Sequence, residues 1–390
     1  MGFQFFIPTK LLFGRGTLNK LAKQKMPGKK GLIVISSGKS VRVSGTLDKV
    51  VEQMKAAGAE SVIFDGISPN PSLENVRAGT ELGRKEGCDF VVGLGGGSSI
   101  DAAKAIAMML TNEGDYWEYQ YGKTGGRKKA KNSPAPLIAI PTTAGTGTET
   151  DPWMVITNEE TNEKIGGGGP KSFPVLSIVD PELMATIPPH LTAYQGFDAL
   201  FHGIECYLAR VATPMSDIYS LKTVEAVGRN LAAAVADGSN MDAREQVAFG
   251  STLAGFAMSF SSNGSEHAME HALSAYHTDL PHGAGLIMIS KEYHTMVAST
   301  VPELADRYVD LARAMGMEDA KEPMDFVKAL VNLQEVCGVA DLKMSDYGMK
   351  LEECPAFADN AKETMGVLFA TDRFQLSREQ VIEIYEKSFR

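Results

Sequence analysis

Histidines are concentrated in one short part of this 390-residue chain. Four of the seven stand there, namely His267, His271, His277 and His282. A further pair, Asp198 and His202, lies upstream. One carboxylate and several imidazoles from separate segments suit a divalent metal that keeps open coordination positions. Open positions are typical of catalysis rather than structural support, so the pattern predicts a metal-dependent enzyme.

The spacing of these residues predicts how they are held. Asp198 and His202 are four residues apart, as are His267 and His271, so on helices each pair lies on one face. His282, in a Pro-His-Gly sequence, is expected on a turn that returns toward them. A single histidine on a helix is more often structural than a ligand, and spacing alone leaves both interpretations open.

Two glycine-rich segments nearer the N-terminus indicate a second kind of site. Residues 91–104, VVGLGGGSSIDAAK, form an apolar strand, a glycine turn and a helix start, and PTTAGTGTE at 141–149 also follows an apolar strand. Glycines let the backbone approach a ligand, and free amides at a helix N-terminus attract phosphate. The G-x-G-x-x-G spacing is absent, so a plain turn stays open for either segment. Two such loops at successive strand ends favour a nucleotide cofactor.

The elements that position these loops alternate in the first half of the chain. Apolar runs at 31–35, 61–64 and 89–94 are separated by amphipathic helices, for which Thr46 and Ser72 are candidate N-caps. Further strands are expected at 136–140 and 176–179. Strand–helix alternation predicts a parallel sheet with right-handed crossovers. The glycine run 166–169 is expected to be a flexible loop beside the cofactor.

From about Thr192 onward the pattern is helical, over 192–209, 214–235 and 242–260. A chain of this length usually forms two domains. We therefore expect an α/β, Rossmann-like dinucleotide-binding domain with a parallel sheet over 1–188. An all-α domain that carries the metal ligands is expected over 189–390.

Composition limits the possible partners and the compartment. The net charge of −10 lacks the basic footprint of a protein that binds nucleic acid or an anionic membrane. The four cysteines show no ligand-like spacing, which favours reduced thiols. Neither a signal peptide nor a membrane span is evident, so a cytoplasmic location is expected.

Several segments in order resemble the iron-containing alcohol dehydrogenases, a family that includes propanediol, butanol and lactaldehyde dehydrogenases. The resemblance rests on GGGSSIDAAKA (95–105), PTTAGTGTE (141–149), G-x-D-A-L-x-H-x-x-E-x-Y (196–207) and H-A-M-x-H followed by P-H-G (267–283). It runs from about residue 6 to residue 294 and is highly specific. The family implies an NAD- or NADP-linked alcohol dehydrogenase or aldehyde reductase with bound Fe²⁺ or Zn²⁺, acting on a small alcohol or aldehyde.

The resemblance also implies roles for individual residues. The implied metal ligands are Asp198, His202, His267 and His282. His271 would lie near the substrate or nicotinamide and help to relay the proton. The implied cofactor contacts are Gly96, Gly97 and Ser98 at the pyrophosphate, Thr142, Thr143, Thr146 and Lys164 further along, and Asn70 near the ribose. The family further implies a homodimer or larger homo-oligomer.

Two departures from the family pattern bear on these expectations. The stretch from His271 to His282 is one residue longer than is common, and His277 within it competes with His282 as the fourth ligand. NAD-dependent members tend to carry Asp after the second strand, whereas this chain has Ser-Ser-Gly-Lys-Ser at 36–40. Lys39 and the serines, Ser40 included, can accept a 2′-phosphate, so both NAD and NADP stay open.

The substrate is less constrained than the reaction. The stretch 259–265 is rich in serine and indicates a hydroxylated or sulfonated aldehyde if it lines the pocket. The other interpretation is a polar helix end away from the pocket. A lyase resembling dehydroquinate synthase, with NAD and metal, is the alternative function, although the D-A-L-x-H motif argues against it. A metal and nucleotide site that serves regulation is a second alternative.

Overall fold

The computed structural model describes residues 2–390, which divide into two compact units. One unit comprises 6–143 and 148–185, and the other comprises 2–5, 144–147 and 186–390. The expected boundary at 188/189 is a single cut, whereas the structure groups the short segment 144–147 with the second unit. The expected fold class is confirmed, because a parallel sheet with helices is followed by an all-helical region.

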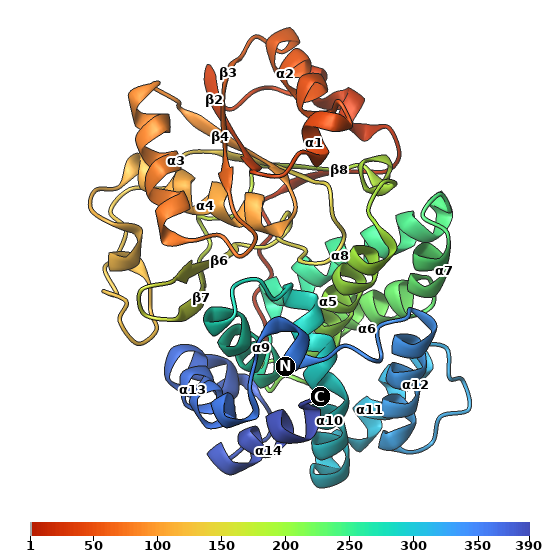
Figure 1. Ribbon diagram of the computed structural model, residues 1–390. Coiled ribbons are helices and arrows are strands. Elements are labelled where there is room, and N and C mark those ends of the chain that lie inside the picture. Colours follow the sequence, from red (N-terminus) through yellow and green to blue (C-terminus); the bar gives the residue numbers. More distant parts are fainter. Residues whose placement is uncertain (1) are drawn as a thin grey trace. The chain divides into compact units, whose positions relative to one another are not determined.

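The first unit is built on a six-stranded sheet in the order β1-β8-β5-β4-β2-β3, and every neighbouring pair is parallel. The strands are β1 (Lys10–Phe13), β2 (Lys30–Ser36), β3 (Glu60–Ile67), β4 (Phe90–Gly95), β5 (Leu137–Pro141) and β8 (Leu176–Val179). Its α-helices are α1 (Ser40–Val43), α2 (Thr46–Ala56), α3 (Leu73–Lys85) and α4 (Gly97–Thr111). Figure 1 shows β2, β3 and β4, in red to orange, between α2 and α3.

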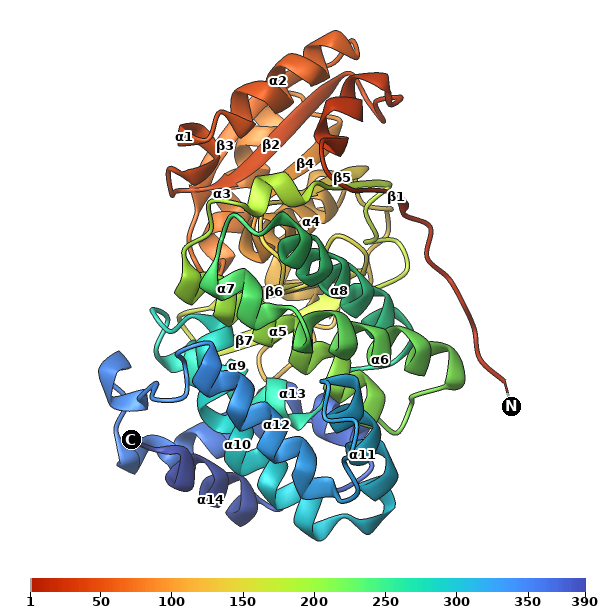
Figure 2. The same ribbon diagram turned by 90° about the vertical axis from the view of Figure 1, so that its right-hand side faces the viewer.

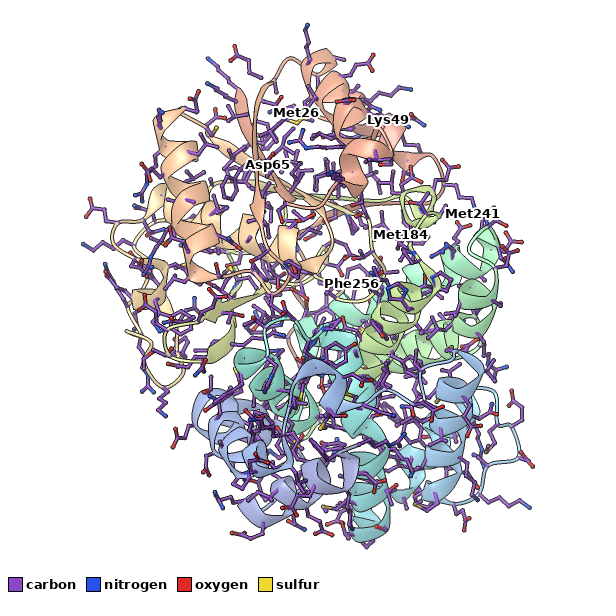
Figure 3. The ribbon with its side chains drawn as sticks, in the orientation of Figure 1. Met26, Lys49, Asp65, Met184, Met241 and Phe256 are labelled. Atoms are coloured by element: carbon purple, nitrogen blue, oxygen red, sulfur yellow. The ribbon has the colours of Figure 1, made fainter. Side chains whose placement is uncertain are left out.

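Alternate residues of each strand pack against different helices, as the two-residue period of a strand requires. Ile33 of β2 belongs to a core cluster with residues of α2 and of the short 3-10 helix η1 (Thr17–Lys23). Met26 packs against the same cluster (Figure 3). The preceding residue, Leu32, points to the other face, where α3 and α4 lie. Both faces are therefore covered, which explains the continuous apolar runs of these strands.

Helix starts in this unit follow the expected capping chemistry at one position and not at another. Ser72 caps α3 and forms a capping box with Asn75. Thr46 is the first residue of α2 rather than its cap, because Gly45 occupies the cap in a left-handed conformation with φ 73°. The expectation for Thr46 is therefore wrong by one position, and glycine supplies a backbone conformation that threonine adopts poorly.

A two-stranded antiparallel sheet in the first unit corrects another expectation. Strands β6 (Trp153–Asn158) and β7 (Glu163–Gly168) pair along their whole length. The glycines expected to form a flexible loop at 166–169 instead lie mostly in β7. Gly168 has φ 141°, and a Cβ there would come within 2.1 Å of the Pro152 carbonyl oxygen, so the close pairing requires glycine.

The second unit is helical. Its α-helices are α5 (Pro189–Leu208), α6 (Pro214–Gly228), α7 (Leu231–Ala236), α8 (Met241–Phe260), α9 (Ser265–Tyr276), α10 (His282–Thr300), α11 (Ala305–Ala314), α12 (Pro323–Val336), α13 (Cys354–Thr371) and α14 (Arg378–Ser388). The single helix expected over 214–235 is in fact two, because Asn230 leaves helical geometry between α6 and α7. Within residues 2–390, every helix is too short or too polar to cross a bilayer.

Helix α5 is the central element of this unit. From Gly196 to Leu208 all of its residues are buried, and it packs against α6, α7, α8 and α10 (Figure 2). Gly196 and Gly203 permit two of these contacts, since a Cβ would meet Leu231 at 2.2 Å and Thr223 at 2.8 Å. A helix enclosed on all sides holds its polar side chains in fixed positions.

Candidate functional site

Asp198 and His202 lie on one face of α5, and His267 and His271 lie on one face of α9. Both spacings of four residues therefore give the expected shared faces. His282 is the first residue of α10 rather than part of a free turn, and Pro281 is its N-cap. Helix α10 packs against both α5 and α9, so the three helices bring these side chains together (Figure 1).

The carboxylate of Asp198 is the centre of this group. Its Oδ1 lies 3.6 Å from His202 Nδ1, 3.6 Å from His267 Nε2 and 3.5 Å from His282 Nε2. Within residues 2–390, neither this oxygen nor His267 Nε2 has a hydrogen-bond partner, although both are buried. Tetrahedral metal bonds of about 2.1 Å place ligand atoms roughly 3.4 Å apart. The donor set therefore fits a divalent ion better than it fits direct hydrogen bonding.

The structure ranks the four expected ligands unequally. Ligand atoms of Asp198, His267 and His282 all lie within 4.8 Å of one another. His202 stacks on His267 with ring centroids 4.5 Å apart, and its Nδ1 lies 3.4 Å from the Gly145 carbonyl oxygen. A proton on Nδ1 directed at that carbonyl leaves the Nε2 lone pair available. His202 as the fourth ligand stays a prediction.

Burial and the neighbouring charges set the protonation of this group. Burial raises the pKa of Asp198, but His202, His267 and His282 lower it by more, to about 2. Burial lowers the pKa of His202 to about 4. For His267, burial lowers the pKa, while Glu205 and Asp198 outweigh it and raise the pKa to about 10. The two carboxylates therefore favour the protonated form of His267, and a bound ion has to displace a proton from this ring.

The two remaining histidines of the cluster, His271 and His277, have different surroundings. The His271 ring lies 5.5 Å from the His282 ring, and ligand atoms of Glu270, His271 and His282 form a second close group. His277 instead lies 3.3 Å from the Glu353 carboxylate and contacts Phe357 edge-on. Since His282 and not His277 faces Asp198, the geometry does not favour His277 as a competing ligand.

Two buried carboxylates beside the site were not among the expected residues. Glu205 contacts His267 Nδ1 and Glu270 contacts His282 Nδ1. A signal for Glu205 exists in the sequence, because it follows Asp198 by seven residues and so lies on the same helical face. Glu270 lies between two histidines of the H-A-M-E-H motif and carries no such signal.

The glycine turn lies where the sequence predicts it, between β4 and α4. Gly95 has φ 146°, Gly96 is the cap of α4, and Gly97 and Ser98 begin its first turn. The amides of a first helical turn have no partner within the helix and suit a phosphate. The turn also lies beside the second loop, because Thr142 N donates to the Gly95 carbonyl at 2.8 Å.

The residues of the second loop divide between the two units. Thr142 and Thr143 follow β5 in the first unit, and Thr143 packs closely against position 96, where a Cβ would lie 3.2 Å from its Cγ2. Thr146 belongs to segment 144–147 of the second unit. In that segment a Cβ at Gly145 would come within 2.8 Å of Gln195 O and 3.1 Å of Asp198 Oδ2, so the loop runs directly against α5.

Three further expected cofactor residues lie elsewhere in the first unit. Lys164 is buried in β7 opposite Thr157. Asn70 adopts a left-handed conformation with φ 52° just before the start of α3. Ser40 is the exposed first residue of α1, after the exposed Lys39.

Three serine hydroxyls of the stretch 259–265 form hydrogen bonds to other groups of the protein. Ser259 Oγ donates to Gly255 O at 2.9 Å, and Ser261 Oγ donates to Cys206 O at 2.8 Å. Ser265 Oγ is bonded to the Tyr293 hydroxyl at 2.9 Å. These bonds favour the interpretation of a polar helix end.

Comparison with known proteins gives the same family along the whole chain. The family model described as iron-containing alcohol dehydrogenase matches residues 8–181, and that for the C-terminal part of the Fe-containing alcohol dehydrogenase family matches residues 192–389. The 1,3-propanediol dehydrogenase of Citrobacter freundii is 34% identical over 396 residues, covering 99% of this chain and 99% of that protein.

Solved structures similar to this one include an alcohol dehydrogenase and an aldehyde reductase. An archaeal halo-thermophilic Red Sea brine pool alcohol dehydrogenase bound to NZQ has a TM-score of 0.94 at 34% identity, covering 100% of this chain and 99% of that chain. The sulfoacetaldehyde reductase of Bifidobacterium kashiwanohense, solved with NAD⁺, has a TM-score of 0.85 at 27% identity, covering 99% and 98%. These matches do not favour a lyase. Since both family models match and the similarity extends over the whole fold, the chain belongs to the iron-containing alcohol dehydrogenase family and is an oxidoreductase that acts on CH–OH groups.

Proposed function

We propose that this protein is a metal-dependent, NAD(P)-linked alcohol dehydrogenase that also reduces the corresponding small aldehyde. One observation carries the metal requirement. The buried Asp198 Oδ1 faces His267 Nε2 at 3.6 Å and His282 Nε2 at 3.5 Å without hydrogen-bonding to any residue in the described chain, 2–390. A buried anion without such a bond is costly, and a cation between it and the imidazoles removes that cost.

In this proposal Asp198, His202, His267 and His282 hold one divalent ion, Fe²⁺ or Zn²⁺. When bound, the ion supplies Lewis acidity that polarises an aldehyde carbonyl or lowers the pKa of an alcohol. One carboxylate neutralises only half of the charge of a divalent ion, which supports this role. The three packed helices fix the direction of each ligand side chain. These side chains therefore need no ordering when substrate binds.

His271 is proposed to move the alcohol proton. It lies one helical turn beyond His267 on α9, and its ring lies 5.5 Å from that of His282. An imidazole can accept a proton at one nitrogen and release one at the other, which suits a relay toward water.

The nicotinamide cofactor is proposed to bind along the carboxyl ends of the parallel strands. Gly96, Gly97 and Ser98 would hold the pyrophosphate by backbone amides, and Asn70 would approach the ribose. The residues proposed further along the cofactor are Thr142, Thr143, Thr146 and Lys164. Near the adenosine end, Lys39 and Ser40 are exposed with no carboxylate at 36–40, which supports acceptance of NADP as well as NAD.

The substrate is proposed to be a small, polar alcohol–aldehyde pair, hydroxylated or sulfonated. The support comes from relatives, since one acts on 1,3-propanediol and another on sulfoacetaldehyde according to their names. The serine-rich stretch 259–265 gives this proposal no support, because three of its hydroxyls hydrogen-bond to other groups of the protein.

A steady-state assay tests the proposed function. Protein reconstituted anaerobically with Fe²⁺ or Zn²⁺ should oxidise NADH or NADPH with short neutral, hydroxylated and sulfonated aldehydes, and metal-free protein should not. Equal turnover without metal would contradict the ligand assignment. Faster turnover of neutral aldehydes would leave the reaction intact and remove the polar substrate class.

Assembly and compartment are proposals as well. Strand β1 lies at an edge of the sheet in the described chain, 2–390, where it pairs with β8 on one side. The edge of a sheet favours pairing with another chain. That supports a homodimer or larger homo-oligomer. Within the same range no two of the four cysteines form a disulfide, which supports a reducing, cytoplasmic compartment.

A further inference from the structure

The His267 ring lies between two carboxylates from one helix. Asp198 Oδ1 is 3.6 Å from its Nε2, and Glu205 contacts its Nδ1 on the opposite side. Glu205 also accepts the His267 backbone N–H at 3.0 Å. Both carboxylates come from α5, whereas the ring comes from α9. Helix α5 therefore determines both the position of the ring and the direction of its two nitrogens.

His282 has an equivalent partner from a different helix. Its Nδ1 contacts the carboxylate of Glu270 on α9, while its Nε2 faces Asp198. Glu270 is buried, and Gly285 in the first turn of α10 makes room for it. A Cβ at position 285 would lie 2.8 Å from Glu270 Cγ and 3.0 Å from its Oε1. The glycine is thus part of what lets the carboxylate reach the ring.

We propose that Glu205 and Glu270 are positioning residues that fix the tautomers of His267 and His282 for metal binding. A neutral imidazole carries one proton, on either Nδ1 or Nε2. A carboxylate at Nδ1 holds the proton there, so the Nε2 lone pair faces Asp198 and an ion beside it. The carboxylate also makes the imidazole a stronger donor. This inference rests on the proposed metal-dependent function.

A third glutamate provides an internal contrast. Glu266 is as buried as Glu205 and Glu270 and lies on α9 next to His267. Its carboxylate lies 3.1 Å from His294 Nε2, and His294 Nδ1 bonds the Tyr308 hydroxyl at 3.0 Å. His294 is not in either group of candidate ligands. Glu266 therefore shares the burial and charge of the two positioning residues without contacting a candidate ligand ring.

The test is a metal dissociation constant for the whole protein, measured by competition of Co²⁺ and Zn²⁺ with a chromogenic chelator. Glu205→Ala and Glu270→Ala should weaken binding by about 10- to 100-fold, the usual effect of removing such a partner. Glu205→Gln and Glu270→Gln should recover part of the loss, because the amide oxygen still accepts the Nδ1 proton. Glu266→Gln should stay within about threefold of wild type.

Two further measurements separate positioning from general damage. The visible spectrum of Co²⁺-loaded protein should change in the Ala variants, since it reports ligand geometry. Gly285→Ala, which replaces no carboxylate or histidine, should also weaken binding because its Cβ displaces the Glu270 side chain. Thermal melting of metal-free protein checks that each variant is folded.

The outcomes distinguish this inference from the function on which it rests. If wild-type protein binds no metal, the proposed function fails. If wild type binds metal and the Glu205 and Glu270 variants bind equally well, the function stands and the inference is wrong. Equal losses in Glu266→Gln and Glu205→Gln would also overturn it, because the effect would then follow from replacing any buried glutamate near His267.

Discussion

The candidate metal centre and the cofactor loops use different parts of the chain for binding. The metal centre consists of side chains on long, packed helices, with Asp198 at its middle. The cofactor loops consist mainly of backbone, such as the amides after Gly95 at the start of α4. A metal is selected by residue type, so few substitutions are tolerated there. A phosphate is held by backbone geometry, so space and dihedral angles matter more than side-chain chemistry.

The largest effect expected from this contrast is at His267. Replacement by Ala removes a metal-facing nitrogen and leaves Asp198 and Glu205 as buried charges that no longer share a partner. Metal content should fall below a tenth of one equivalent and turnover by about a thousandfold or more. Elemental analysis and initial rates check this. His277→Ala is the matched control, because His277 pairs with Glu353, and it should retain the metal.

In the cofactor loops, Gly95→Ala should act through geometry alone. Gly95 has φ 146°, and a Cβ there would lie 2.6 Å from Ser99 Oγ. If the displaced turn loses about 1–3 kcal/mol of cofactor binding, KM for NAD(P)H should rise by roughly 5- to 150-fold. Metal content should be unchanged, which elemental analysis of the same sample would show. Simultaneous loss of metal would mean that the two sites are not separable in the way we describe.

A smaller effect is expected at the adenosine end. Lys39→Asp introduces the carboxylate that residues 36–40 lack. Repulsion of a 2′-phosphate should lower kcat/KM for NADPH by about tenfold relative to NADH. The ratio of the two specificity constants is the measurement, and Lys49→Asp on α2 serves as a surface control (Figure 3). An unchanged ratio would place the adenosine ribose elsewhere.

The smallest effect concerns the stability of the helical unit. Burial, together with Glu205 and Glu266, raises the pKa of Asp372 from 3.8 to about 8, although hydrogen bonds from Ser265 oppose the shift. Between about pH 4 and pH 8 the unfolded carboxyl is ionised while the folded one is not, so the free energy of unfolding falls as pH rises. The contribution of Asp372 to the free energy of unfolding is fully present below about pH 4 and is lost as the pH rises through about 8.

Asp372→Asn cannot ionise and should remove this dependence. Its melting temperature should exceed that of wild type at pH 8 by a few degrees, and the difference should shrink at pH 5. Its amide oxygen can still accept from Ser265 N. A variant less stable than wild type at both pH values would show that Asp372 is ionised in the folded protein.

Local patterns in the sequence predict the parts of this fold that depend on local chemistry. The strands at 31–35 and 89–94, the cap at Ser72 and the shared face of Asp198 and His202 all follow from periodicity or capping. The hairpin β6–β7 is not predictable in this way, because β7 ends in glycines that favour a loop when considered alone. Close pairing with β6 overrides that preference.

Some features of the candidate site can likewise be predicted from the sequence, and others cannot. Spacing predicts which residues share a helix face, but not that His282 rather than His277 faces Asp198, since that depends on how α10 packs against α5 and α9. The place of segment 144–147 has the same origin. Its link to the second unit comes from close backbone approaches of Gly145 and Gly147, which no local pattern indicates.

The arrangement on α5 has a consequence for how this enzyme can change over time. Asp198, His202 and Glu205 occupy one stripe, so a one-residue insertion between them would turn everything beyond it by about 100° around the helix axis. Length changes inside this helix are therefore excluded even where single substitutions are acceptable. The connection between α9 and α10, from His277 to Pro281, carries no such phase relationship. A change of length there would leave the buried faces of both helices unaltered.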